Sequence, residues 1–296
     1  MITQNIKTQG QFFRTGWVRA LSILRPSCHA LIAPDAVVLD TGGNGRPLVR
    51  QRRNQTGSLE EQFDTAVSDL LQLMDASGTH GRRLHLVVSD FWARPLVLPL
   101  PGTPTSDEEV DIVLQSQYRR TYGDLMDGWR WCWERQGVQL VAVAWPAKGL
   151  AALADGMARR AGTLASARPL AIDIASQAQG QGVSSWLAII ERHSATLVRQ
   201  QEGVWQDWCV MPDALDMAVS LPLQLARETA RRRDDCRTLT LVDLNGAPNL
   251  ERIKLVKLIK QTLADAGWSV SVRAANETGT SLAIRLSQAV TLGTPV

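Results

Sequence analysis

The two halves of the chain predict the same order of strands and helices. Hydrophobic periodicity assigns to each half three strands, a helix, a strand, a helix, a strand and a closing element. Residue identities do not repeat between the halves, so the repeat concerns the order of elements alone. A chain with such a repeat is expected to form two similar α/β domains with a cleft between them.

The individual elements follow from apolar spacing and turn residues. Several strands have nearly continuous apolar runs, which are typical of buried parallel strands. The first half places strands at 29–32, 36–40, 47–52, 84–90 and 138–145, and helices at 58–77 and 146–160. The second half places strands at 186–191, 194–200, 205–210, 237–244 and 268–273, helices at 221–233 and 249–266, and a helix or strand at 281–290. The predicted domains are 28–166 and 167–296, joined by a strand at 170–174 and a Gln/Gly-rich link that ends at Gly182.

A small additional unit interrupts the first half. It lies between the strands at 84–90 and 138–145, which we expect to be members of one sheet. Its second strand, at 129–135, carries three tryptophans at every other position, so their side chains share one face. We therefore predict a β-α-β insert over 91–136 in the first domain.

Local signals define the rest of this insert. Pro95 and Pro99 predict that its first strand lies at a sheet edge, because proline cannot donate a hydrogen bond to a neighbouring strand. Ser106 and Glu109 have the spacing of a capping box, which predicts a helix that runs to Tyr122. The inner side of this helix is expected to carry Val110, Val113, Leu114 and Gln117.

The N-terminal segment, residues 1–27, allows two interpretations. Its aromatic and aliphatic residues fall on one helical face with arginines between them: Phe12, Phe13, Trp17, Leu21 and Leu24. This pattern is typical of a helix that binds an anionic membrane surface or a groove on a partner. The alternative, which we favour, is a helix that packs on its own domain.

Composition argues against several functions. A net charge of +3 is too small to predict nucleic-acid binding. The four cysteines are far apart and the four histidines are scattered, so neither predicts a metal site, and the cysteine pattern fits a reducing compartment. No signal peptide and no run of about 18 apolar residues is visible. We therefore expect a soluble cytoplasmic protein whose contact with a membrane is indirect.

No catalytic residue stands out. There is no G-x-S-x-G nucleophile motif. Asp243 ends a buried strand, where α/β folds bind ligands, but its position before Asn245 and Gly246 favours a turn or helix-cap role. The glycine-rich stretch 41–45 predicts a hairpin turn rather than a phosphate loop, because no helix follows it directly. We expect no catalytic site and no metal site.

Three stretches, taken together with the doubled order, resemble a known class of proteins. They are 86–94, 168–174 and 187–202. The resemblance is to the actin/Hsp70/FtsA class of ribonuclease-H-like nucleotide-binding proteins. Within that class the chain is similar to PilM of type IV pilus assembly, to the cytoplasmic domain of GspL from type II secretion, and to BfpC of the bundle-forming pilus. The resemblance covers about 28–290 and implies an actin-like α/β fold with two ribonuclease-H-like domains.

The chain departs from active members of that class at both phosphate-binding turns. Active members place an Asp-x-Gly turn after the first strand of each domain, where the aspartate holds Mg²⁺ through water and the glycine lets amides approach phosphate. Here the turns at 32–35 and 190–194 contain no glycine, and Pro34 lacks an amide donor. The resemblance therefore implies a fold retained for binding after ATP chemistry was lost, with no cofactor. The alternative is a functional protein of the same machinery that binds ATP and Mg²⁺.

The resemblance also implies partners and a location. It implies a non-catalytic scaffold of a type IV pilus or type II secretion assembly platform. This scaffold would link the cytoplasmic tail of a bitopic inner-membrane protein to the hexameric assembly ATPase, at the inner face of the inner membrane. We expect the turn at Pro34 and the turn at 191–193 to face each other across the cleft.

The insert is the predicted partner-binding surface. The chain contains 10 Trp but only 2 Tyr and 4 Phe, and a lobe of this size cannot fully bury three indoles on one face. Aromatic and arginine side chains together are typical of interface hot spots, although core packing is an alternative role for any single tryptophan. The predicted partner-binding residues are Trp129, Trp131, Trp133, Arg119, Arg120 and Tyr122.

Overall fold

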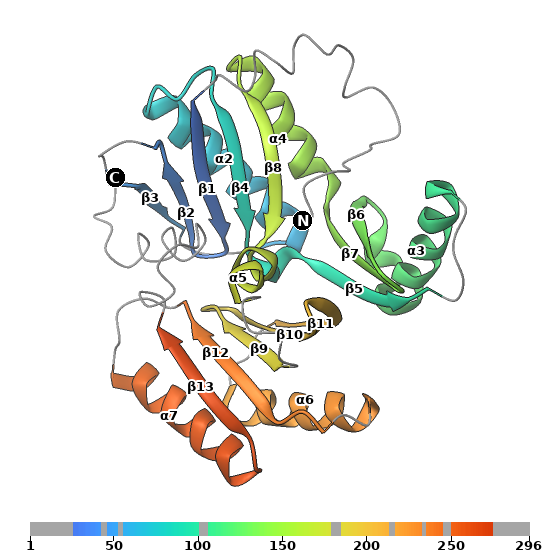
Figure 1. Cartoon of the computed structure of the whole chain (residues 1–296). Helices are drawn as coiled ribbons and strands as arrows, with labels where there is room; N and C mark the ends of the chain where they lie inside the picture. The colour runs from blue at the N-terminus through green and yellow to red at the C-terminus, as the bar shows by residue number, and fades with distance from the viewer. Residues whose placement is uncertain are drawn as a thin grey trace.

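The computed structural model describes residues 26–42, 46–52, 56–100, 106–178, 185–212, 217–232, 235–244 and 250–274. The expectations for the Phe12 to Leu24 face and for the element at 281–290 lie outside these residues. Figure 1 shows two α/β domains, one above the other, with the insert beside the first. No helix in the described ranges combines the length and apolar character needed to cross a bilayer.

The first domain is built on a five-stranded sheet in the order β3-β2-β1-β4-β8. Its strands are β1 (Ser27–Ala33), β2 (Ala36–Asp40), β3 (Leu48–Gln51), β4 (Arg83–Val88) and β8 (Thr163–Pro169). The pairs β1–β2 and β2–β3 are antiparallel, whereas β4 lies parallel to both β1 and β8. A two-residue turn, Pro34 and Asp35, joins β1 to β2, whereas the parallel strands need the longer crossovers between them.

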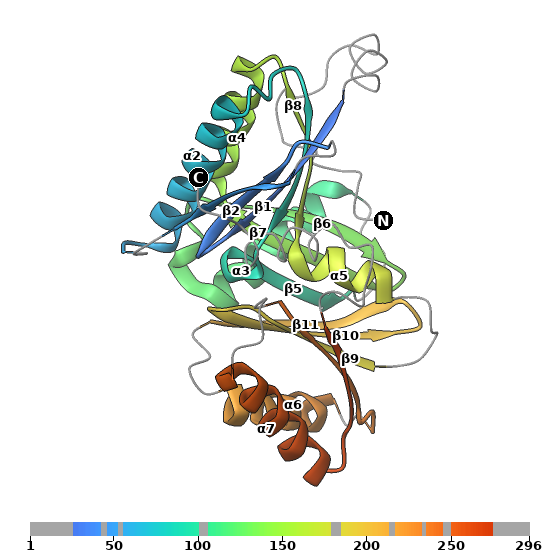
Figure 2. The same cartoon turned by 90° about the vertical axis from the view of Figure 1, so that its left-hand side faces the viewer.

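Helices α2 (Leu59–Ala76) and α4 (Ala147–Arg159) cover one face of this sheet (Figure 2). The predicted capping box starts α2, because Ser58 accepts a hydrogen bond from the Glu61 amide and Glu61 accepts one from the Ser58 amide. Two glycines let α4 lie close to α2. A Cβ atom on Gly149 would be 2.5 Å from the Phe63 ring, and one on Gly156 would be 2.6 Å from Leu71.

The second domain repeats this plan with the sheet order β11-β10-β9-β12-β13. Its strands are β9 (Ser185–Ile190), β10 (Ser194–Gln201), β11 (Val204–Pro212), β12 (Thr238–Asp243) and β13 (Ser269–Ala274). Helices α6 (Met217–Arg232) and α7 (Leu250–Asp265) pack together on the side of the sheet away from the first domain (Figures 1 and 2). The sequence predicts all seven of these elements, with ends that differ by a few residues.

The insert has a three-stranded sheet of its own, in the order β5-β7-β6. Its elements are β5 (Arg94–Pro99), α3 (Asp107–Tyr122), β6 (Trp129–Gln136) and β7 (Gln139–Pro146), with 3₁₀ turns η1 (Asp90–Trp92) and η2 (Gly123–Met126). The expectation that the strands at 84–90 and 138–145 share one sheet is therefore wrong. The insert is β-α-β-β rather than β-α-β, and its sheet extends beyond the predicted end at residue 136.

The composition of β7 explains this error. Its even-numbered residues, among them Leu140 and Ala142, pack in the core of the insert, and its odd-numbered residues, among them Val141 and Trp145, pack in the core of the first domain. Because two different cores bury its two faces, β7 is apolar throughout, which the sequence analysis interpreted as a strand of the main sheet.

The true last strand of the first sheet, β8, has no continuous apolar run. It lies at the sheet edge, and most of its side chains are only half-buried. The predicted strand at 170–174 is instead the start of helix α5 (Leu170–Ala178), which lies between the two domains in Figure 1. Residues 170–175 are all buried, because a helix between two domains is covered all round.

One hydrophobic core extends across both domains, and the second domain has a further core of its own. Trp205 and Trp208 of β11 belong to the same buried cluster as Trp92 and Trp145 of the first half of the chain. The Trp205 and Trp208 rings lie 5.1 Å apart between centroids. The insert adds a polar contact, because the Trp205 amide donates to Gln136 Oε1 at 3.2 Å. Separating the domains would therefore expose large aromatic surfaces to water.

Replacing Gly149 tests the close packing of α4 on α2. Gly149→Val should lower the free energy of unfolding by about 1–3 kcal/mol, because the fully buried Phe63 ring has no room to move away. Urea unfolding measures the change. Ala151→Val, at an exposed position of the same helix, is the matched control and should cost less than about 1 kcal/mol. Equal effects of the two substitutions would contradict the close contact.

Candidate functional site

The two phosphate-binding turns expected from the sequence meet at the domain boundary. The first turn, Pro34 and Asp35, joins β1 to β2, and the second, residues 191–193, joins β9 to β10. Arg192 Nη1 lies 3.6 Å from Asp35 Oδ2, so an ion pair connects the two turns. The expectation that these turns face each other is confirmed. Because Arg192 is largely exposed, this ion pair contributes little stability by itself.

Arg52 stabilises the first turn through hydrogen bonds. Its Nη1 donates to the Pro34 carbonyl at 3.1 Å, and its Nη2 donates to the Gln62 carbonyl at 2.9 Å. Its Nε lies 3.2 Å from Asp69 Oδ2, and its guanidinium carbon lies 5.8 Å from the centre of the Trp92 ring. The turn is therefore held by a buried cation whose donors are already engaged.

A buried carboxyl group from the first domain lies at the same place. Asp90 follows β4 and is completely buried, and its Oδ2 accepts a hydrogen bond of 2.9 Å from the Ala171 amide at the start of α5. This contact satisfies one of the free amides at the N-terminus of that helix. Burial raises the pKa of Asp90 well above its usual value, and the negative charge of Glu191 raises it further.

The second domain contributes Glu191, which is also buried. Its Oε1 accepts a hydrogen bond of 3.2 Å from the Ser194 hydroxyl group, and its backbone amide donates to the Ser194 carbonyl at 2.9 Å. Burial raises the pKa of Glu191 to about 7, the charge of Asp35 adds to the rise, and hydrogen bonds from Ser89 and Ser194 oppose it. Two buried carboxyl groups this strongly coupled favour a state in which at least one is protonated.

The chemistry of this site opposes a bound phosphate group. A phosphate needs amide donors or free cations, but Pro34 has no amide hydrogen, and the donors of Arg52 are engaged by Asp69 and by two carbonyl groups. In their charged forms, Asp90 and Glu191 would repel a phosphate that carries no bound cation. Asp243 ends β12 beside Ile190 in the same sheet, which adds another acidic group to this edge. The described residues of these two turns therefore do not fit a phosphate group held by amides and free cations alone. The described residues also contain no group of three or more side chains suited to a metal ion.

The predicted partner-binding tryptophans lie on one face of β6, against α3. The Trp131 and Trp133 indoles both donate to Asp111 Oδ1, at 3.1 and 3.3 Å, and both remain half-buried. Trp129 is only 6% exposed and donates to Glu60 Oε1 of α2 at 2.7 Å. Trp129 therefore attaches the insert to the first domain, whereas the other two offer accessible surface.

The remaining predicted residues lie at the C-terminal end of α3. Arg119 and Arg120 are exposed, and the half-buried Tyr122 donates its hydroxyl hydrogen to the Pro95 carbonyl at 2.9 Å. The structure therefore brings Tyr122 against β5, whereas Trp131 and Trp133 contact Asp111, nearly three helical turns earlier.

The sequence analysis missed two residues of this surface. Asp111 orients two indoles, and the fully buried Tyr118 stacks on Trp131 with 5.5 Å between ring centroids. Both lie on the helix face of Leu114, at three- and four-residue spacing, which is the signal that could have identified them. Val113, expected on the inner side of the helix, is instead 41% exposed.

Comparison with known proteins identifies the fold. No family model and no curated protein sequence matches this chain. A Bacteroides thetaiotaomicron protein with an actin-like ATPase fold and unknown function is 7% identical, with a TM-score of 0.58 over 92% of this chain and 97% of that one. A chain of the PilM–PilN type IV pilus biogenesis complex is 13% identical, with a TM-score of 0.59 over 90% of this chain and 98% of that one.

A third solved structure is the cytoplasmic domain of EpsL, an inner-membrane component of the type II secretion system of Vibrio cholerae. It is 10% identical, with a TM-score of 0.49 over 91% of this chain and 95% of that one. At these identities structural similarity establishes the fold. The chain has an actin-like α/β fold, as its resemblance to this class implies.

The raised pKa of Glu191 predicts a pH-dependent stability. The native state keeps this proton up to about pH 7, whereas an unfolded glutamate loses it near its ordinary pKa of 4.5. The free energy of unfolding should therefore fall as the pH rises through this range. Glu191→Gln removes the titrating group, so the variant should match the natural protein at about pH 5 and exceed its stability by roughly 2–3 kcal/mol at about pH 8.

Urea unfolding at both pH values measures this difference. The matched control is Glu202→Gln, which changes an exposed glutamate at the next hairpin turn and should behave like the natural protein at both pH values. The stability difference between Glu191→Gln and the natural protein should therefore be larger at about pH 8 than at about pH 5. An equal difference at both pH values would show that Glu191 does not retain a proton in the folded state.

Proposed function

We propose that this protein is a non-catalytic scaffold of a type IV pilus-like or type II secretion-like assembly machine. In this role it acts in the cytoplasm at the inner face of the inner membrane. It links the cytoplasmic tail of a bitopic inner-membrane protein to the hexameric assembly ATPase.

The observation that carries the proposal is the pair of carboxyl groups at the meeting point of the two turns. Asp90 and Glu191 occupy the region where an actin-like protein would hold phosphate, and both are buried. The shared core of Trp92, Trp145 and Trp208 supports it, because nucleotide-driven opening would expose these rings. A rigid body that presents fixed surfaces suits a scaffold.

The fold similarity supports the choice of machinery. One of the similar solved structures is a PilM–PilN complex of type IV pilus biogenesis, in which a protein of this fold is assembled with a partner. The insert offers the best described surface for a corresponding contact. Trp131 and Trp133 are half-buried and held by Asp111, so a partner can bury their remaining surface without reordering them.

Nucleotide titration distinguishes the scaffold from a functional ATP-binding protein. The scaffold should show no thermal shift with Mg-ATP at millimolar concentration. A site of micromolar affinity would add about 4 kcal/mol of stability at a thousandfold excess of ligand. A shift that saturates with Mg-ATP and is absent with Mg²⁺ alone would overturn the scaffold proposal in favour of the ATP-binding alternative.

Tryptophan substitutions test the partner-binding surface. Trp131→Ala and Trp133→Ala should each weaken binding of the membrane-protein tail by roughly 2 kcal/mol, because each removes a large, oriented aromatic contact. Calorimetric titration of the tail peptide against each variant measures the loss. Arg130→Ala is the matched control, since Arg130 is exposed and alternates with these tryptophans onto the opposite face of β6. Unchanged binding in both tryptophan variants would exclude this face of the insert.

A further inference from the structure

Exposed apolar side chains gather on two separate surfaces of the described residues. One is the outer face of α3 in the insert. The other is the α6–α7 pair, where Ile253 and Leu258 lie on opposite sides of α7. Six of the eight large apolar side chains that are exposed in the described residues lie on these helices: Ile112, Val113, Val219, Leu223, Ile253 and Leu258. Such clusters, rather than single exposed residues, mark interaction surfaces.

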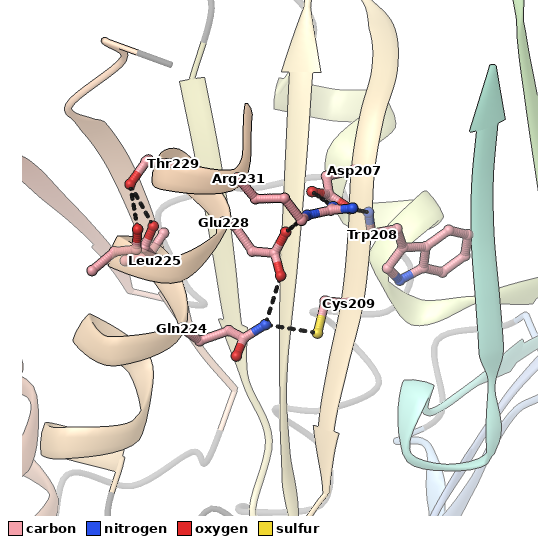
Figure 3. Close-up of polar contacts among 9 residues, drawn as sticks. Asp207, Trp208, Cys209, Gln224, Leu225, Glu228, Thr229 and Arg231 are labelled. Carbon is pink, nitrogen blue, oxygen red and sulfur yellow. Dashed lines mark hydrogen bonds and ion pairs between the residues drawn. The ribbon is translucent and has the colours of Figure 1, made fainter. Parts of the chain in front are cut away.

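The inner and lateral contacts of α6 define which face remains open. Leu221 and Leu225 are fully buried against the sheet. Along one side, Arg231 pairs with Asp207 of β11 at 3.0 Å and Gln224 contacts Cys209 of the same strand, as Figure 3 shows. These contacts fix the orientation of the helix.

The outer face of α6 is apolar over its whole length. Val219, Leu223, Ala226 and Ala230 follow each other at four-, three- and four-residue spacing, and all four are exposed. Leu223 is 68% exposed, and on the adjacent α7 Leu258 is 54% exposed. The small residues near the C-terminal ends border a hollow of about 390 Å³ beside Trp268. This surface can receive the side chains of another helix.

The same surface is positively charged. Arg227 of α6 and Lys254, Lys257 and Lys260 of α7 are all exposed, and they outnumber the exposed acidic residues described there, Asp265 of α7 and Asp235 at the edge of the hollow. An occupant of this surface should therefore combine apolar side chains with negative charge.

The N-terminal half of α3 has this composition. Ile112 is 67% exposed and Val113 is 41% exposed, and the exposed side chains of Glu108 and Glu109 lie within one helical turn of them. Their inward-facing neighbours, Val110 and Leu114 among them, are buried, so the apolar and acidic residues share the outer face.

We propose that the α3 face of one copy of this protein docks on the α6–α7 face of a second copy. Pairing either face with itself would bring like charges together, whereas pairing one with the other brings opposite charges and apolar side chains into contact. The two faces cannot meet within one molecule, because α6 and α7 lie on the side of the second domain away from the first (Figures 1 and 2). Such a contact is head-to-tail and builds a ring or an open chain of subunits.

Sedimentation of the whole chain tests self-association. The weight-average mass should rise above the 32.5 kDa of one chain as concentration increases. The rise should be smaller at about 1 M salt than at about 0.1 M, because salt shortens the range of charge attraction. A natural protein that remains a single chain at all concentrations up to about 0.5 mM at low salt overturns the proposal, since even a weak contact of millimolar affinity would be visible there.

Two blocked variants test which faces meet. Glu108→Lys with Ile112→Lys alters the α3 face only. Leu223→Ser with Lys257→Ser removes an apolar side chain and a positive charge from the α6–α7 face only, so the two altered faces are not complementary in charge. Each variant alone should sediment as one chain, with an association constant at least tenfold below that of the natural protein. Their equimolar mixture should form a complex of two chains and no larger species, because one intact α3 face and one intact α6–α7 face remain.

The control is Val138→Lys. Val138 is apolar, 72% exposed and outside both faces, so this variant should associate like the natural protein. Circular dichroism and thermal unfolding establish that every variant is folded. Association by either blocked variant alone, or a mixture of folded variants that contains only single chains, overturns the head-to-tail contact.

Discussion

Aromatic packing between the two halves of the chain is the interaction on which the rest of the structure depends. Trp205 and Trp208 lie in one continuous core with Trp92 and Trp145, so the two domains behave as one hydrophobic unit. Actin-like proteins that respond to nucleotide need domains that can separate. In this protein separation would transfer several indole rings to water, at about 25 cal/mol for each Å² exposed.

The polar groups at the domain boundary also have partners that keep the two domains packed together. Asp90 satisfies the start of the buried helix α5, and Glu191 closes its own hairpin through Ser194. Both carboxyl groups therefore have structural partners within the chain. Burial and mutual repulsion raise the pKa of both groups, which favours a retained proton. The region where the two turns meet is therefore part of the packing between the domains.

The order of elements predicts most of this fold, because capping boxes and apolar periods are local signals. Ser58 and Glu61 start α2 where the sequence places it, and the second domain follows its predicted order. The sequence analysis failed where burial depends on distant contacts. The apolar run of β7 arises because two different cores bury its two faces, and the mixed composition of β8 arises because it lies at a sheet edge. Without the packing, the sequence could not show which of the two strands belongs to the main sheet.

The same distinction applies to the candidate sites. Missing glycines and Pro34 predict a degenerate phosphate site from sequence alone, since they change local backbone chemistry. Asp90 is buried against Ala171, which lies far away in the chain. Asp111 of α3 contacts two indoles of another element of the insert, β6. No local pattern encodes such pairs.

Strand β7 also determines how the insert transmits force. It is the central strand of the insert sheet and ends at Pro146, and helix α4 begins at the next residue, Ala147. There is no flexible joint between them, and α4 packs closely on α2 through Gly149 and Gly156. A pull or torque applied to the insert by anything bound there would reach the helical layer of the first domain directly. The insert therefore acts mechanically as a lever fixed to that domain rather than as a tethered attachment.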